Sequence, residues 1–123
     1  MNDKTSLSVY LRSNTIRVYK STIRMLGTPK YIQFRVHSDG NSIIVLPYPK
    51  QTFTSFRVPK NIYDEDADME VHSKMLCEII AQKHNWDKEY SYRVPGRYVP
   101  EQNIVIYDFK CASIIPQNLH FVK

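Results

Sequence analysis

Short stretches in which apolar and polar residues alternate run through most of the chain. In 6–11, for example, Leu7, Val9 and Leu11 alternate with serine and tyrosine. A period of two places successive side chains on opposite faces of a strand, so this pattern predicts half-buried β-strands. We expect strands over 6–11, 15–19, 31–36, 42–46, 53–58, 69–71, 89–94 and 104–109.

Two segments have the signals of helices instead. Ser21 and Ser73 each precede a run without glycine or proline, and a serine hydroxyl at this position can accept a hydrogen bond from the first helical turn. Gly27 and Asn85 are residue types that adopt the left-handed conformation in which many helices end. We therefore predict helices over 22–26 and 74–84, and turns at 38–41 and 95–96.

The order strand, helix, strand, strand occurs twice along the chain. At an offset of 53 residues, Ile16 and Leu26 of the first half align with Met69 and Ile79 of the second. A shared helix position is harder to obtain by chance than aligned strands, which favours an internal duplication. The alternative is that alternating strands align with one another without a common origin.

The repeated order leads to a specific prediction of fold class and domain organisation. We expect an α+β fold of two pseudo-repeated β-α-β-β units, with mainly antiparallel strands and two short helices around one core. The whole chain, 1–123, forms a single compact domain in this prediction. Its parts are a basic β-α-β-β unit over 5–49, a connector with an acidic loop over 50–68, and a second β-α-β-β unit over 69–115.

The composition excludes several classes of protein. With 42% hydrophobic and 24% charged residues, the chain is neither collagen-like nor a disordered acidic tail, and two cysteines are too few for a disulfide scaffold. No signal-peptide pattern follows Met1, and the longest apolar runs are far shorter than the ~20 residues of a membrane span. We therefore predict a cytoplasmic protein without a membrane partner.

Cys77 and Cys111 are expected to be reduced and buried, and a single disulfide between them is the alternative.

Charge is distributed unevenly between the two halves. Residues 1–60 contain ten Lys or Arg and two Asp, a net charge of +8, whereas residues 61–123 contain seven Lys or Arg and ten Asp or Glu, a net charge of −3. A strongly basic half favours a polyanionic partner, either nucleic acid or an acidic protein surface. The alternative is that the two halves neutralise each other in the folded protein.

Alternation also places basic and aromatic side chains on the strand face opposite to the apolar one. Arginine binds phosphate through two parallel hydrogen bonds, and tyrosine stacks on unpaired bases. The predicted nucleic-acid-binding residues are Arg12, Arg17, Tyr19, Lys20, Arg24, Lys30, Tyr31, Gln33 and Arg35. The alternative is that both faces of the sheet are covered and that these residues only surround the core.

No catalytic residue, cofactor or metal site is predicted, and we do not expect an enzyme. The three glycines do not cluster into a phosphate-binding loop, and the four histidines are not at metal-ligand spacing with the cysteines. The acidic residues within 64–68 lack the glycine and the distal glutamate of a calcium-binding loop. A solvated loop is the simpler interpretation of this cluster.

One part of the chain resembles a known family. A basic strand at Thr15–Ser21, a one-turn helix that ends in Leu26–Gly27, a strand at Ile32–Val36 and a polar hairpin follow one another. This order is similar to that of the swapped-hairpin DNA-binding domains of AbrB-type regulators. The resemblance implies that one internally duplicated chain does what two copies do in that family.

The resemblance also implies which side chains lie nearest the nucleic acid. Arg17, Lys20 and Arg24 correspond most closely to the DNA-facing positions of the family. The equivalent positions in the second half of the chain are Glu70, Ser73 and Cys77, which carry none of these positive charges. Contact with a polyanion is therefore expected to be one-sided.

Together these observations predict a small cytoplasmic nucleic-acid-binding protein, such as a regulator from a bacterium or a mobile element. It would contact the phosphate backbone of DNA or RNA through its basic N-terminal half, as a monomer or a homodimer. The alternative is a non-enzymatic protein-interaction inhibitor from a phage or mobile element. An anti-CRISPR protein that blocks a nucleic-acid-guided effector by docking on protein or guide RNA is one example.

Overall fold

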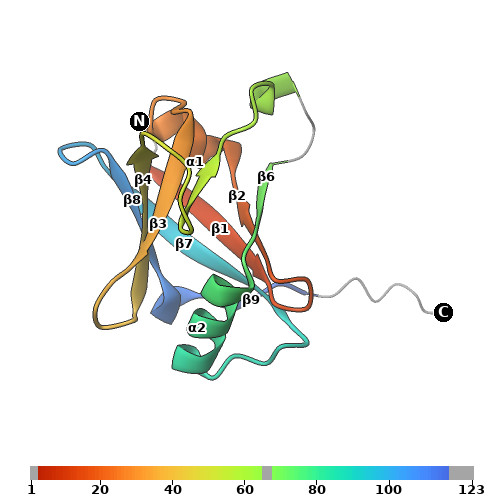
Figure 1. Cartoon of the computed structure of the whole chain (residues 1–123). Helices are drawn as coiled ribbons and strands as arrows, with labels where there is room; N and C mark the ends of the chain where they lie inside the picture. Colours follow the sequence, from red (N-terminus) through yellow and green to blue (C-terminus); the bar gives the residue numbers. More distant parts are fainter. Residues whose placement is uncertain (1–2, 65–67, 117–123) are drawn as a thin grey trace.

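In the computed structural model, residues 3–64 and 68–116 are described, and they form one antiparallel sheet with two α-helices (Figure 1). The nine strands in this part of the chain are β1 (Lys4–Tyr10), β2 (Thr15–Val18), β3 (Tyr31–Val36), β4 (Ser42–Tyr48), β5 (Ser55–Arg57), β6 (Met69–His72), β7 (Ser91–Val99), β8 (Ile104–Asp108) and β9 (Ser113–Ile114). The helices are α1 (Lys20–Met25) and α2 (Lys74–His84), with short 3₁₀ helices η1 (Ile62–Asp64) and η2 (Phe109–Cys111).

The strands lie in the order β5-β3-β4-β8-β7-β1-β2-β6, and β9 pairs with β7. Every neighbouring pair is antiparallel. The sheet curls around its apolar face into a nearly closed barrel, with β5 and β6 at its two ends (Figure 1). Two strands of the C-terminal half, β8 and β7, are thereby inserted between β4 and β1 of the N-terminal half.

The predicted α+β fold of two β-α-β-β units is wrong. In such a unit the strand before the helix would belong with the hairpin after it, but β2 pairs with β1 and β6. The long strand β7 likewise pairs with β1, from Lys4 opposite Arg97 to Tyr10 opposite Ser91. Pairing across the whole chain gives every strand between β5 and β6 a partner on both edges, which satisfies backbone groups that separate units would leave exposed.

Side chains that point into the barrel are apolar and almost completely buried, as the alternation predicts. They include Leu7, Val9, Ile16, Val18, Ile32, Phe34, Ile43, Val45, Val94 and Val105. Tyr107 is the largest fully buried side chain in the described part of the protein, and its hydroxyl forms a hydrogen bond with that of Thr22. This partner makes it possible to bury a phenolic hydroxyl in an apolar core.

The two helices differ in how they begin. The Ser73 hydroxyl accepts a hydrogen bond from the N–H of Leu76 at the start of α2, as predicted. Helix α1 begins one residue before Ser21, and the Ser21 hydroxyl contacts that of Thr5 at 2.6 Å instead of capping the helix.

No helix within the described ranges is long and apolar enough to cross a membrane. Residues 65–67 of the predicted acidic loop lie outside the described residues.

Candidate nucleic-acid interface

The nine residues predicted to bind nucleic acid do not form one surface. Arg17 lies on β2 and Tyr19 follows that strand, whereas Tyr31, Gln33 and Arg35 lie on β3. The strands β4, β8, β7 and β1 separate β3 from β2. Because the sheet is strongly curved, the two sets of side chains point away from different parts of the barrel wall.

The cations on and beside β2 have acidic partners. Nη2 of Arg17 lies 3.3 Å from Oε2 of Glu70, which is directly opposite on β6. At the turn between β1 and β2, Nε of Arg12 lies 3.9 Å from Oε1 of Glu89. Exposed ion pairs add little stability, but they reduce the positive charge that this region offers to a polyanion.

The two residues that follow β2 are also engaged with neighbouring groups. The hydroxyl of Tyr19 lies 2.9 Å from that of Ser8 on β1. The backbone N–H of Lys20 donates to the carboxylate of Asp68, with an N–O distance of 3.0 Å. An acidic side chain therefore lies at the start of α1, and this side of the predicted interface is close to neutral.

Three adjacent strands, β5, β3 and β4, come entirely from the basic half of the chain. None of them contains an acidic residue, and the whole segment 40–63 lacks Asp and Glu. We refer to the outward-pointing side chains of these strands as the β5–β3–β4 face. They are Tyr31, Gln33, Arg35, Ser42, Ile44, Leu46, Tyr48, Ser55 and Arg57.

Two arginines of the β5–β3–β4 face are held by neighbouring side chains. Nε of Arg35 donates to Oε1 of Gln33 at 2.7 Å. The guanidinium of Arg57 lies 5.8 Å from the ring centre of Tyr31, its direct partner in the ladder between β5 and β3. Arg35 is four residues from Tyr31, so the two arginines are separated by about 13 Å along the strand direction. Both arginines are exposed, so their charges face solvent.

Basic and aromatic groups continue from this face towards α1. The guanidinium of Arg24 lies 4.7 Å from the ring centre of Tyr63, and the Tyr63 hydroxyl lies 2.6 Å from that of Thr28. The carbonyl of Lys30 accepts the N–H of Val58, which joins the start of β3 to the end of β5. Arg24 and Lys30 therefore extend the face at the end where Arg57 lies.

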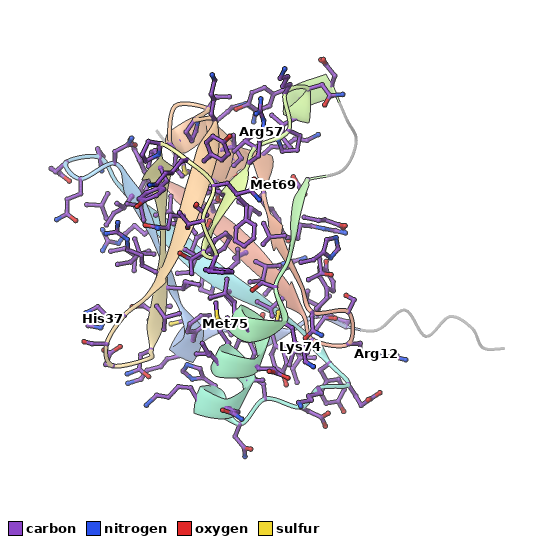
Figure 2. All side chains as sticks on the ribbon, viewed as in Figure 1. Arg12, His37, Arg57, Met69, Lys74 and Met75 are labelled. Carbon is purple, nitrogen blue, oxygen red and sulfur yellow. The ribbon has the colours of Figure 1, made fainter. Side chains whose placement is uncertain are left out.

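Figure 2 labels one cation from each of the two regions. Arg57 lies at the end of the molecule that holds α1 and η1, whereas Arg12 lies at the opposite end with Lys74 of α2. Of the nine predicted residues, the structure gathers Arg24, Lys30, Tyr31, Gln33 and Arg35 around the β5–β3–β4 face. It leaves Arg12, Arg17 and Tyr19 elsewhere, with Lys20 at the start of α1.

Sequence reasoning missed several residues of this face. Lys50, Arg57, Lys60 and Tyr63 all belong to the segment that we interpreted as a connector. The predicted strand over 53–58 is confirmed in part by β5, which carries Arg57. The signal was therefore present, but the sequence does not show that β5 pairs with β3.

A groove of about 610 Å³ adjoins the β5–β3–β4 face at Ser42, which lies opposite Asp108 on β8. Its lining includes the basic residues Lys4, Arg97 and Lys110 and the acidic residues Asp39 and Asp108. A backbone hydrogen bond from Asn41 lowers the pKa of Asp39, so this carboxylate is charged at neutral pH. Because the groove is mixed in charge, it matches a polyanion less well than the β5–β3–β4 face does.

Both cysteines are free thiols, and their surroundings differ. Burial raises the pKa of Cys77 to about 11. Cys111 is exposed, contrary to the prediction that both are buried, and its hydrogen bond to the Asp108 carboxylate raises its pKa. Within residues 3–64 and 68–116, no group of three or more His, Cys, Asp and Glu side chains is placed to hold a metal ion.

Comparison with protein-family models, with curated proteins and with solved structures finds no match for the chain. The resemblance to AbrB-type regulators therefore stays a prediction. Among the predicted binding residues, those of the β5–β3–β4 face lie on strands that carry exposed arginines and no acidic residue, and the function is argued from this face.

Proposed function

We propose that the protein is a small cytoplasmic, non-catalytic nucleic-acid-binding protein that uses the β5–β3–β4 face. The observation that supports this proposal best is the strand order, which brings β5, β3 and β4 together without an acidic residue on any of them. The cations on and beside this face are Arg24, Lys30, Arg35, Lys50, Arg57 and Lys60. Exposed arginine and lysine side chains bind phosphate through charge-assisted hydrogen bonds.

Binding of this kind depends steeply on salt concentration, because each neutralised phosphate releases counterions. If all six cations contact phosphates, the slope of log K against log salt concentration is about −5.4 for a duplex and about −4.2 for a single strand. These contacts carry no sequence information by themselves, so we expect weak discrimination between sequences.

Charge reversal tests the proposed surface. We expect the double variant Arg35→Glu, Arg57→Glu to bind a fluorescein-labelled oligonucleotide at least about 30-fold more weakly than the natural protein, because two phosphate contacts become repulsive. Fluorescence anisotropy over a salt series measures both the affinity and the slope. Because two phosphate contacts are lost, the magnitude of the slope of log K against log salt concentration should decrease by roughly 1.4 to 1.8.

The matched control carries the same change of net charge far from the face. Lys74 and Lys88 are both exposed, and Figure 2 shows Lys74 at the opposite end of the molecule from Arg57. The double variant Lys74→Glu, Lys88→Glu should lose less than about threefold, through long-range electrostatics alone. Equal losses in the two variants, or no salt-sensitive binding by the natural protein, would falsify the proposal.

A second candidate function is favoured by one feature of α2. Met75 and Ile79 lie one turn apart on this helix and are 47% and 45% exposed. Exposed apolar pairs on a helix are typical of protein contacts, as expected of an inhibitor that docks on an effector. The variant Met75→Ser, Ile79→Ser distinguishes the two functions, because it should keep the full affinity for nucleic acid if the β5–β3–β4 face is the interface.

A further inference from the structure

The loop between β4 and β5 holds Phe53 out into solvent. Phe53 is 93% exposed, more than any other large hydrophobic side chain in the described part of the chain. Folding usually covers a large part of an aromatic ring, because its burial is worth several times the thermal energy. A phenylalanine left this open is therefore available for contact with a ligand.

The loop that carries Phe53 is fixed by its own hydrogen bonds. The hydroxyls of Thr52 and Ser55 lie 2.8 Å apart, and the N–H of Thr54 donates to the Thr52 hydroxyl at 3.2 Å. The Ser55 hydroxyl, which is completely buried, donates to the carbonyl of Lys50 at 2.7 Å. A ligand that contacts Phe53 therefore loses little affinity to ordering of this loop.

The same loop is attached to the β5–β3–β4 face between its two arginines. Nε2 of Gln33 donates to the Thr54 hydroxyl at 3.4 Å, and Oε1 of Gln33 accepts from Arg35. The backbone N–H of Phe34 donates to the carbonyl of Thr54 at 2.8 Å. Gln33 points outward in the strand register yet is only 8% exposed, because the loop covers it.

Along β3, the attachment at Gln33 lies midway between Arg35 and Tyr31, which faces Arg57. Phe53 therefore projects from a loop anchored between two exposed guanidinium groups. Lys50 belongs to the same loop, and neither this loop nor β5, β3 or β4 contains an acidic residue. An aromatic ring between phosphate-binding groups is the arrangement that recognises a base together with its backbone.

We propose that Phe53 stacks on an unpaired base, so that the β5–β3–β4 face takes single-stranded DNA or RNA in preference to a duplex. The proposal rests on the proposed function and names its substrate class. In a duplex every base is already stacked and only base edges are accessible in the grooves, whereas a single strand exposes whole base faces. Every base has such a face, so the preference is for single strands and not for a sequence.

The test uses the full chain with a labelled dT 12-mer, an rU 12-mer and a 12-base-pair duplex. We expect Phe53→Ala to weaken binding of the single strands by about 5- to 150-fold, the equivalent of ~1–3 kcal/mol for one stacked base. Binding of the duplex should change by less than about twofold. Because Phe53 is 93% exposed, the substitution removes no core contact, and circular dichroism should be unchanged.

Two further variants control for the role of the ring. Phe53→Trp keeps a stacking surface and should retain the affinity for dT, and the emission of the new indole should be quenched when the strand binds. Tyr90→Ala removes another exposed aromatic ring, immediately before β7, and should leave binding of all three ligands unchanged. An abasic 12-mer keeps the phosphates without the bases, and it should bind the natural protein and Phe53→Ala equally.

The outcomes separate this proposal from the one on which it rests. If the natural protein binds single strand and duplex equally, or Phe53→Ala has no effect on dT and rU, the stacking role is overturned while nucleic-acid binding stands. If Phe53→Ala weakens binding of the duplex and of the single strands equally, Phe53 acts as a wedge between paired bases, and the stacking role is also overturned. If the natural protein binds none of the three ligands, both proposals fail.

Discussion

Gly96 lies directly against the ring of Tyr107 in the middle of the sheet. A Cβ atom added to Gly96 would stand 2.5 Å from Cδ1 and Cε1 of that ring. We predicted a turn at 95–96 because proline followed by glycine usually forms one. Instead, β7 continues through both residues, from Ser91 to Val99. The missing side chain of Gly96 serves packing, which a sequence cannot distinguish from a turn.

This contact predicts a large effect for a small substitution. Gly96→Ala should lower the free energy of urea unfolding by about 2–3 kcal/mol, because the fully buried Tyr107 has no room to move. Gly27→Ala is the comparison, since Gly27 has positive φ and no atom within 4 Å of the added Cβ, and it should lose only about 1 kcal/mol. If the loss is steric, Gly96→Ala should lower the free energy of unfolding less in a Tyr107→Leu background than in the natural protein.

The two helices illustrate how capping can be predicted and how it can fail. Both Ser21 and Ser73 precede helix-forming residues, but only Ser73 caps. The chain enters α1 directly from β2, so Lys20 is already helical and the Ser21 hydroxyl is used in a contact with Thr5 of β1. Local sequence predicts which hydroxyls can cap, whereas tertiary contacts decide which ones do.

Removal of the α2 cap should have a measurable local effect. Ser73→Ala leaves the N–H of Leu76 without its side-chain acceptor and should destabilise the protein by about 1 kcal/mol. Ser73→Asp provides an acceptor in the same place and should stay within about 0.3 kcal/mol of the natural protein. Hydrogen exchange at Leu76 should be faster in Ser73→Ala only. An unchanged exchange rate would contradict a capping role for Ser73.

At the level of strands, the sequence locates elements better than it pairs them. Alternation predicts the regions of β1, β3, β4 and β8 and the residues they bury. It does not reveal that Arg17 lies opposite Glu70, 53 residues away, or that Arg57 lies opposite Tyr31. The apolar face of a strand can pack beside many other apolar strands, so alternation alone does not select the pairing partner. The partner depends on the whole sheet.

For the whole molecule, this pairing changes the meaning of the uneven charge. The +8 of residues 1–60 suggested one basic half, but β8 and β7 separate β3–β4 from β1–β2 in the sheet. Glu70 and Glu89 then lie beside Arg17 and Arg12, while no acidic residue lies on β5, β3 or β4. Some of its side chains, such as Arg35, could be predicted from the sequence, whereas alternation does not single out Arg57, and the surface that gathers them is a product of strand order.

Two buried side chains of the core, Cys77 and Tyr107, predict how the stability of the protein changes at alkaline pH. Burial raises the pKa of Cys77 to about 11 and raises that of Tyr107 above its ordinary value. In the unfolded chain the thiol loses its proton near its ordinary pKa of 9.0, whereas the folded protein retains it. The unfolded state therefore binds fewer protons between pH 9 and 11, and stability falls as the pH rises through this range. Below pH 9 neither state is ionised and this effect is absent.

The prediction is checked by thermal unfolding at pH 8 and pH 10.5. Cys77→Ala is less stable than the natural protein at pH 8 because it leaves a small cavity, but its Tm should fall less between the two pH values, by on the order of 4 °C. Ile80→Val provides a destabilised core without a change in titratable groups, and its Tm should fall as far as that of the natural protein. If Cys77→Ala and Ile80→Val lose the same number of degrees, the buried thiol does not contribute to alkaline unfolding, and other groups must account for it.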